Sequence, residues 1–201
     1  MRTFLLSLFA CLLPLTVSAA PVILVFGDSL SAGYGIAKQD AWPSLLETRL
    51  KDSGYSYAVV NASISGETTA GGRSRLPELL RQQQPKIVII ELGANDGLRG
   101  LPIAGMRDNL KFMVKQSQQA GARVMLVGMR IPPNYGREYT EKFAATFTEL
   151  SKEHKTALVP FLFEGFALRP DAFQPDRLHP TAATQPLMLD TIWKQLKPLL
   201  K

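Results

Sequence analysis

The sequence has few of the residues that build metal centres and covalent cross-links. It contains one cysteine, Cys11, and two histidines, His154 and His179, among 201 residues. A lone cysteine excludes a disulfide within the chain and a cysteine-based zinc site, because both need further thiols. So small a number of histidines also argues against a histidine-rich metal centre. We therefore expect neither a metal nor any other cofactor.

The apolar run near the N-terminus is too short to span a membrane. It covers residues 4–17, which is 14 residues, whereas a membrane-spanning helix needs about 20. Arg2 precedes the run and small residues follow it, a pattern typical of a cleavable signal peptide. We predict that residues 1–19 are a signal peptide cleaved after Ala19. Residues 20–201 would then form the exported protein, periplasmic or secreted.

An alternative interpretation of the same segment is a lipoprotein signal, in which Cys11 becomes the acylated first residue. Phe9 is bulky where such a signal has a small residue, and the apolar run continues well beyond Cys11. Simple export is therefore favoured. The exported chain then has no cysteine. It is compatible with an oxidising compartment but forms no disulfide there.

The chain has a modest excess of positive charge. It has 23 Lys and Arg against 17 Asp and Glu, a net charge of +6. The basic residues are scattered and interleaved with acids, unlike the basic stripe of a nucleic-acid-binding protein. The length, with 46% hydrophobic and 20% charged residues, suits one globular domain. We expect a monomer that acts on a small molecule, makes transient contact with an anionic membrane surface, and binds no nucleic acid.

Short apolar runs alternate with amphipathic stretches after the N-terminal segment. The runs are rich in β-branched residues, which is typical of strands covered on both faces. They lie at residues 22–26, 57–61, 86–92, 123–129 and 157–161. Apolar side chains three and four residues apart predict helices around residues 42–50, 106–114, 139–150 and 188–199, the last opening after Pro180-Thr181. A further helix around 72–83 is less regular because Pro77 lies inside it.

This alternation of strands and helices predicts an α/β fold. Strand and helix alternate five times, which implies three layers, α/β/α, with a parallel sheet between the helices. The flavodoxin-like strand order 2-1-3-4-5 fits such a sheet. Ligands bind these sheets outside the carboxyl ends of the strands. Chemistry is therefore expected in the loops that follow the strands.

The first strand runs into Ser29, within the sequence Gly-Asp-Ser-Leu. This glycine-rich segment matches neither a P-loop, nor a dinucleotide fingerprint, nor the G-x-S-x-G of α/β-hydrolases. What remains is a serine just after a buried strand, flanked by small residues that allow a backbone to approach closely. Ser29 is either the cap of the following turn or a nucleophile.

Three further strand ends carry polar candidates. Gly66 is either a turn glycine or a residue whose N–H faces the site, and Asn95 is either a turn former or a donor to an oxyanion. After the fifth strand, an aperiodic loop of about 20 residues carries Asp176 and His179. Their spacing lets one turn bring carboxylate and imidazole together, so that the carboxylate orients the base. His154 lies in a polar helix end and is interpreted as a surface residue.

Four blocks of the sequence resemble, in order, those of the SGNH (GDSL) hydrolases. They are Gly27-Asp28-Ser29-Leu30, Gly66, Gly93-Ala94-Asn95-Asp96 and Asp176-Arg177-Leu178-His179-Pro180. Segments 95–100 and 132–136 resemble, more narrowly, the periplasmic multifunctional thioesterase, lysophospholipase and arylesterase group. Two positions depart from the family pattern: Arg177 stands where glycine is frequent, and Thr181 where asparagine is frequent.

The resemblance implies a flavodoxin-like fold and metal-free catalysis by Ser29, His179 and Asp176. It also implies an oxyanion hole formed by the Ser29 N–H, the Gly66 N–H and the Asn95 side chain. Substrates of the narrower group are fatty acyl esters and thioesters. The implied function is therefore an exported hydrolase of acyl esters, acyl thioesters and lysophospholipids, acting through an acyl-enzyme on Ser29.

Apolar residues near the active edge are candidates for an acyl groove. The candidate substrate-binding residues are Ile131, Pro132 and Tyr135, with Ile103 and Met106 close by, and all are equally consistent with ordinary core. Among the acids, Asp28 and Asp96 are expected to cap turns. Glu91, inside an apolar strand, must find a partner or stay protonated if it is buried.

Two other functions remain open at this point. A carbohydrate O-acetylesterase shares the same four blocks, and it would need a small pocket with aromatic residues for sugar stacking. A flavodoxin-like domain could also bind a lipid or a nucleotide without catalysis. Covalent labelling by a fluorophosphonate would separate an enzyme from a binding module.

Overall fold

Five short strands form one parallel sheet in the computed structural model, which describes residues 20–200. They are β1 (Val22–Gly27), β2 (Ala58–Asn61), β3 (Ile87–Glu91), β4 (Arg123–Val127) and β5 (Ala157–Val159). Their order is β2-β1-β3-β4-β5, and each neighbouring pair is parallel. The flavodoxin-like α/β fold is thus confirmed, with small shifts at the strand ends. The predicted signal peptide, residues 1–19, lies outside the described residues.

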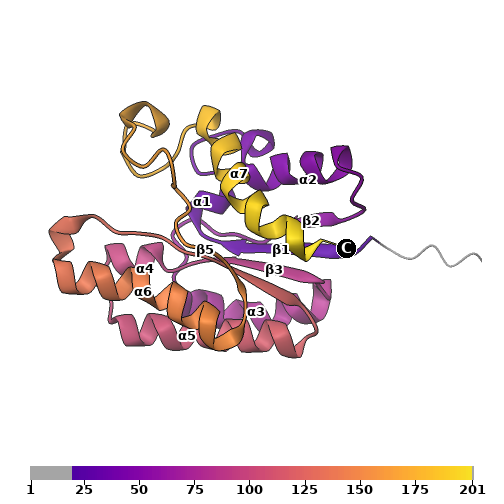
Figure 1. The fold of residues 1–201 in the computed structure, drawn as a ribbon, viewed down its shortest axis with the longest axis horizontal. Helices are drawn as coiled ribbons and strands as arrows, with labels where there is room; N and C mark the ends of the chain where they lie inside the picture. Colours follow the sequence, from indigo (N-terminus) through magenta and orange to yellow (C-terminus); the bar gives the residue numbers. More distant parts are fainter. Residues whose placement is uncertain (1–19, 201) are drawn as a thin grey trace, which may run out of the picture.

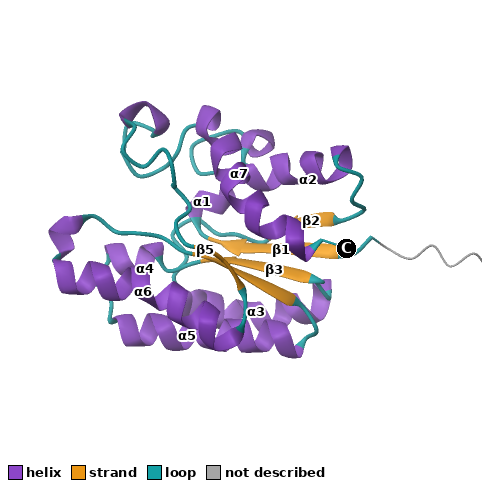
Figure 2. Ribbon diagram, in the orientation of Figure 1, coloured by secondary structure: helices purple, strands orange, loops and turns teal. Residues whose placement is uncertain are grey.

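The helices form two layers, one on each face of the sheet (Figure 1). On one face, α2 (Trp42–Asp52) packs against α7 (Gln185–Leu196). On the other face lie α3 (Thr69–Gln83), α5 (Ile103–Gln119) and α6 (Arg137–His154). Figure 2 shows the strands enclosed between these two layers. Two short helices, α1 (Ser29–Ala32) and α4 (Ala94–Leu98), follow β1 and β3 almost directly.

The sheet lies at the centre of the hydrophobic core. All of β3 is buried, and in β1 only the first residue is partly exposed. Both faces of the strands are covered, which explains their nearly continuous apolarity. The apolar stripes of the long helices face the sheet and are buried, as predicted: Trp42, Leu46 and Leu50 in α2, Met106, Leu110 and Met113 in α5, Phe143, Phe147 and Leu150 in α6, and Met188, Ile192 and Leu196 in α7.

Two helix predictions needed adjustment. The less regular helix around Pro77 is a continuous α3, because Pro77 and Arg73 both lie on its exposed side. The Arg73 carbonyl loses its N–H partner at the proline, and Arg73 is an exposed residue. The last helix begins at Gln185 rather than directly after Thr181, because a 3-10 turn (Ala182–Thr184) precedes it.

The carboxyl ends of all five strands meet at one edge of the sheet, since the strands are parallel. In Figure 1 this edge is on the side away from the C-terminus, where the loop after β5 (orange to gold) projects. The short helices α1 and α4 begin at this edge and carry Ser29 and Asn95. Among residues 20–200, none of the helices combines the length and apolarity that crossing a membrane requires.

Candidate active site

Ser29 is the first residue of α1, directly after the tight turn that leads from β1. Buried Asp28 caps α1, because its Oδ1 accepts a hydrogen bond from the Leu30 N–H at 3.0 Å. Gly27 lets this turn pack closely, since a Cβ there would lie 2.7 Å from Glu91 Oε2. The Ser29 Oγ lies 2.8 Å from His179 Nε2. The turn thus directs the serine hydroxyl at an imidazole.

Asp176 and His179 meet within one turn of the loop after β5. Asp176 Oδ2 accepts from His179 Nδ1 at 2.7 Å, and its Oδ1 accepts from the Leu178 and His179 N–H groups at 2.9 and 3.0 Å. These bonds, the backbone ones foremost, lower the pKa of Asp176 to about 2. A carboxylate only accepts, so Nδ1 carries the proton and the Nε2 lone pair faces Ser29. The structure brings together the three side chains that the sequence proposed as nucleophile, base and orienting acid.

The loop that carries His179 is fixed by its own hydrogen bonds. Phe173 and Pro180 pair as an antiparallel bridge, and the Gln174 N–H donates to the His179 carbonyl at 2.8 Å. The Gln174 side chain donates to the Tyr34 carbonyl at 2.8 Å, tying the loop to the segment after α1. The Tyr34 ring lies 4.5 Å from the imidazole, centroid to centroid. These contacts hold the imidazole in place over the nucleophile turn.

The candidate oxyanion donors come from three different strand ends. Asn95 Nδ2 donates to Asp28 Oδ2 at 3.1 Å and to the Glu67 carbonyl at 3.0 Å, so its amide is held beside the nucleophile turn. Gly66 has φ of +80°, a conformation that favours glycine. Within residues 20–200, the Ser29 and Gly66 N–H groups donate to no protein acceptor. Both are therefore free to donate to a bound oxygen.

Two buried carboxyl groups lie behind the nucleophile turn. Burial raises the pKa of Asp28 to about 6, against the lowering effect of its hydrogen bonds. Burial, and then the charge of Asp28, raise the pKa of Glu91 well above its ordinary value. Glu91 Oε2 accepts from Ser31 Oγ at 2.7 Å, while Oε1 is buried with no hydrogen-bond partner. Its surroundings therefore favour the protonated form of Glu91.

Asp96, predicted to cap a turn, instead binds the start of a helix that is distant in the sequence. Its carboxylate accepts from the Thr69 N–H at 2.9 Å and from Thr69 Oγ1 at 2.5 Å, at the start of α3. It thereby ties α4, which carries Asn95, to α3. Among the described residues, no cluster of His, Cys, Asp and Glu side chains is suited to hold a metal ion.

A cavity of about 550 Å³ opens beside Ser29 and His179. Its lining is mostly apolar and includes two of the predicted groove residues, Ile131 and Pro132. The other apolar lining residues are Leu30, Ala94, Leu98, Met129, Pro133, Phe161, Phe163, Ala167, Leu168, Phe173 and Leu178. Asp28, Asn95, Arg130 and Arg177 are the polar members beside the serine and histidine. The cavity therefore places an apolar wall next to the candidate nucleophile.

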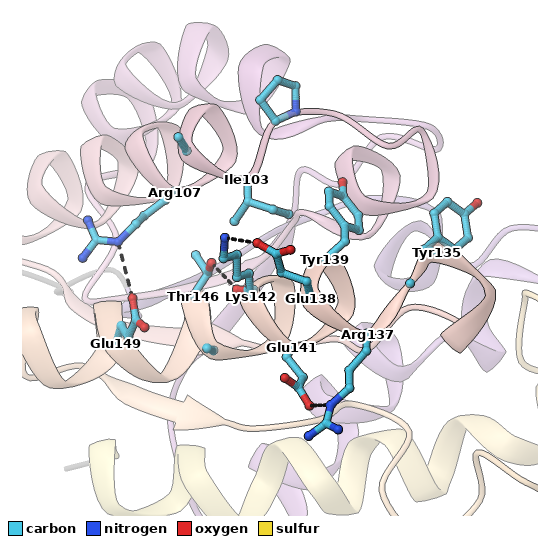
Figure 3. Close-up of a pocket in the computed structure, with 14 residues that line it drawn as sticks. Ile103, Arg107, Tyr135, Arg137, Glu138, Tyr139, Glu141, Lys142, Thr146 and Glu149 are labelled. Carbon is cyan, nitrogen blue, oxygen red and sulfur yellow. Dashed lines mark hydrogen bonds and ion pairs between the residues drawn. The ribbon is translucent and has the colours of Figure 1, made fainter.

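Tyr135, the third candidate substrate-binding residue, does not line this cavity, and its role in substrate binding stays a prediction. Its hydroxyl donates to the Leu98 carbonyl at 2.8 Å, which turns the ring into a neighbouring groove between α5 and α6. Figure 3 shows this α5–α6 groove, with Ile103 on its wall. Met106 is core. His154, predicted to be exposed, is half-buried at the last turn of α6, with 12% of its side chain accessible.

Sequence reasoning missed most of the aromatic wall of the cavity. Phe163 and Phe173 belong to the predicted loop after the fifth strand, and Phe161 ends the predicted strand at residues 157–161, whereas β5 itself ends at Val159. The available signal was the density of phenylalanines in a loop, where apolar side chains need a partner to be buried. Arg130, which also lines the cavity, precedes the predicted Ile131 directly.

Comparison with known proteins gives consistent results. The profile of the GDSL-like lipase/acylhydrolase family matches residues 25–186. Esterase TesA of Pseudomonas aeruginosa PAO1 is 48% identical over the full length of both chains. Thioesterase 1/protease 1/lysophospholipase L1 of Escherichia coli K12 is 43% identical over 193 residues, which is 96% of this chain and 91% of the relative.

Solved structures agree with these relatives. The crystal structure of TesA superimposes with a TM-score of 0.87 at 48% identity, covering 89% of this chain and 99% of that one. The psychrotrophic esterase EstA from Pseudoalteromonas sp. gives a TM-score of 0.84 at 42% identity, covering 88% and 97% of the two chains. With this fold and these relatives, the chain belongs to the GDSL-like lipase/acylhydrolase family and is an ester and thioester hydrolase.

Proposed function

We propose that the protein is an exported serine hydrolase that cleaves fatty acyl esters, acyl thioesters and lysophospholipids through an acyl-enzyme on Ser29. The observation that carries this proposal is the chain of contacts from Asp176 to His179 (2.7 Å) and from His179 to Ser29 (2.8 Å), beside an apolar cavity. Nucleophile, base and orienting acid are each within hydrogen-bond reach of the next.

In the acylation step, His179 Nε2 takes the proton of the Ser29 hydroxyl while Oγ forms a bond to the acyl carbon. The imidazolium, stabilised by the Asp176 carboxylate, then gives this proton to the leaving alcohol or thiol as the bond to the acyl carbon breaks. In the deacylation step, a water molecule gives its proton to Nε2 and attacks the ester. The fatty acid leaves, and the proton returns to Ser29 Oγ.

The negative charge that develops on the carbonyl oxygen needs hydrogen-bond donors already in position. The Ser29 N–H, the Gly66 N–H and the Asn95 amide are proposed for this role. Asn95 is held by Asp28 and by the Glu67 carbonyl before the substrate arrives, so it needs little reorganisation. An oxyanion would share the Nδ2 protons with these acceptors.

The lining of the cavity supports a fatty acyl chain as the group that is bound. Ile131, Pro132 and three phenylalanines offer apolar surface next to Ser29, and burying apolar area contributes about 25 cal/mol per Å². The structure constrains the leaving group less than it constrains the acyl chain. The relatives' names include esterase, thioesterase, lysophospholipase and arylesterase, and we propose a similar range of leaving groups here.

The remaining elements of the proposal concern the place and state of the enzyme. The apolar run at residues 4–17, preceded by Arg2, supports export by a signal peptide that ends at Ala19. The mature enzyme, residues 20–201, would act in the periplasm or outside the cell as a monomer. It would take its substrates as single molecules or from a lipid surface, and it would bind no nucleic acid.

The test is covalent labelling followed by a hydrolysis panel. Incubation with a fluorophosphonate should add one probe mass to the protein, on the peptide that contains Ser29. Hydrolysis should increase from acetyl to longer acyl groups, for both ester and thioester leaving groups. Absence of labelling would point to a binding module, whereas activity confined to acetylated oligosaccharides would indicate a carbohydrate O-acetylesterase.

A further inference from the structure

The exposed large apolar side chains of residues 20–200 all lie at the catalytic end of the molecule. Six such residues are more than a third exposed: Tyr34, Ile64, Leu101, Leu168, Leu178 and Leu187. Five of them are in the loops that follow β1, β2, β3 and β5, and Leu187 is in the first turn of α7, which starts at that same end. Leu168 is 96% exposed, and the others are 38–53% exposed.

Isolated apolar side chains are normal on a protein surface. A group of them at one end of the molecule is unusual. Leu168 and Leu178 line the catalytic cavity, and Tyr34 stacks near His179. These three side chains therefore border the opening through which a substrate enters. Leu168 is on the loop after β5 that projects from the sheet in Figure 1. An almost fully exposed leucine on a projecting loop costs free energy in water that contact with an apolar phase would recover.

Two arginines line the same cavity. Arg130 lies with its guanidinium 4.7 Å from the centre of the Phe161 ring, and Arg177 is in the turn of the catalytic pair. Neither forms an ion pair with any residue among 20–200. Arg177 has φ of +59°, which favours glycine, so the backbone supplies no reason for an arginine there.

The acids of this loop do little to neutralise the two arginines. Asp176 is engaged by His179, and Asp171 pairs with Arg169 at 2.8 Å. Glu164 is exposed and without an ion pair among the described residues. Asp28 is the one carboxyl group that lines the cavity, and it is buried. Guanidinium groups beside exposed leucines match a surface that presents phosphates above acyl chains, since arginine binds phosphate in a bidentate manner.

We propose that this end of the molecule docks on a phospholipid surface, with Leu168 among the acyl chains and Arg130 and Arg177 at the phosphates. The docking surface is defined as Tyr34, Leu101, Arg130, Leu168, Arg177 and Leu178. This inference rests on the proposed function, because it makes the lipid surface the source of the acyl substrate. Docked in this way, the cavity opens toward the lipid, and an acyl chain reaches Ser29 without crossing water.

The test measures binding to vesicles by co-sedimentation, using the Ser29→Ala protein so that no lipid is hydrolysed. Vesicles of phosphatidylcholine are compared with vesicles of phosphatidylcholine mixed with phosphatidylglycerol. We expect binding to both, and tighter binding to the anionic mixture. Leu168→Ser should weaken binding about tenfold or more, because burying a leucine contributes about 1.5–3 kcal/mol. Arg130→Gln should weaken binding to the anionic vesicles about fivefold, at about 1 kcal/mol per arginine near the surface.

The matched control for charge is Lys51→Gln. Lys51 is exposed and borders a hollow with Ala58, the first residue of β2, so it lies at the opposite end of the sheet. This variant should bind vesicles like the parent protein. Leu168→Ser should leave the unfolding temperature unchanged, because a side chain that is 96% exposed removes little packing.

Three results would overturn the docking proposal. The first is that the Ser29→Ala protein binds neither kind of vesicle. The second is that adding Leu168→Ser leaves vesicle binding equal to that of the Ser29→Ala protein. The third is a concentration-dependent dimer that Leu168→Ser dissociates, which would mean that a second copy of the chain covers this surface. Hydrolysis of a water-soluble acyl ester by the enzyme with Ser29 intact, without vesicles, tests the proposed function separately. Hydrolysis without vesicle binding therefore rejects the docking surface alone.

Discussion

Two neighbouring hollows among residues 20–200 differ in chemistry, and the larger of the two has the less reactive lining. The α5–α6 groove has a volume of about 930 Å³, and the cavity beside Ser29 about 550 Å³. In the groove, charges are matched: Lys142 pairs with Glu138 at 2.6 Å, and Arg137 pairs with Glu141 at 2.7 Å (Figure 3). In the cavity, a serine faces an imidazole and two arginines lack ion-pair partners among the described residues.

The difference comes from the elements that build each hollow. The Lys142–Glu138 and Arg137–Glu141 pairs of the groove are each four residues apart on α6, where opposite charges meet on adjacent turns and satisfy each other. A third pair, Arg107 with Glu149 at 3.8 Å, joins α5 to α6. The cavity is lined by loops after the strands, whose side chains converge from distant parts of the sequence. Volume therefore does not identify the active site of this protein. The active site is identified instead by polar groups that are held in position but are not neutralised by their neighbours.

The largest expected effect is that of Ser29→Ala. Removing the nucleophile should lower kcat by roughly 10³–10⁶, while the protein stays folded because little volume is lost. Glu141→Gln, in the α5–α6 groove, should retain the parent kcat and KM. Both are measured with one soluble acyl ester. More than about a tenth of the parent activity in Ser29→Ala would exclude Ser29 as the nucleophile.

Asp176→Asn should lower kcat by about 10²–10⁴, because the amide no longer fixes the imidazole in the form that accepts the serine proton. The hydrogen bonds that Asp176 accepts hold its pKa at about 2, below the ordinary 3.8, so the carboxylate stays ionised and able to orient the imidazole between pH 5 and pH 8. The measurement is kcat at saturating substrate in that range, and an unchanged kcat would mean that Asp176 only shapes the turn.

Asn95→Ala should lower kcat by about 10²–10³ with a smaller change in KM, because its amide is aimed at charge that develops in the transition state. The matched variant on the other hollow is Tyr135→Phe, which removes only the hydroxyl bonded to the Leu98 carbonyl. It should keep the parent kcat. A rise in KM without loss of kcat in Asn95→Ala would make Asn95 a substrate-binding residue.

The smallest expected effect is on stability. The folded protein holds the Glu91 proton to higher pH than the unfolded chain, which releases it above about pH 4.5. The stability associated with Glu91 is therefore present below that pH and is lost as pH rises through the raised pKa of the folded state. Glu91→Gln carries no such proton, so its Tm should fall less than that of the parent protein between pH 5 and pH 8. Parallel Tm profiles for both proteins would show that Glu91 does not titrate differently on folding.

Much of the fold could be predicted because the sheet is covered on both faces. Buried parallel strands need continuous apolar runs, and these are visible in a single sequence. The short helices α1 and α4 could not be predicted, because four or five residues are too few to show a period. The regularity of α3 could not be predicted either. A helix tolerates a proline such as Pro77 when that side of the helix faces water, and the sequence does not show which side does.

The meeting of Ser29, Asp176 and His179 could be predicted because parallel strands bring their ends to one edge, and a three-residue spacing closes one turn. The residues that line the cavity could not be predicted in the same way. Ile131 and Pro132 line the cavity whereas Tyr135 lines the α5–α6 groove, although all three are close in sequence. The Tyr135 hydroxyl donates to the Leu98 carbonyl from its place in the groove. Such a contact has no signature in the spacing of residues.

The contact between Gly27 and Glu91 also bears on how this sequence can vary. Gly27 does not have a positive φ, so its backbone would accept any residue. A Cβ at this position would meet Glu91 Oε2 at 2.7 Å and Ser31 Oγ at 2.8 Å. Positions 27 and 91 are therefore constrained to change together. A randomised library at position 27 alone should return glycine, whereas one that also admits smaller residues at 91 and glycine at 31 should return alanine, because the Ser31 Cβ lies only 2.9 Å from the added Cβ. The first glycine of the Gly-Asp-Ser-Leu block is thus retained by Glu91 on another strand together with Ser31 on α1.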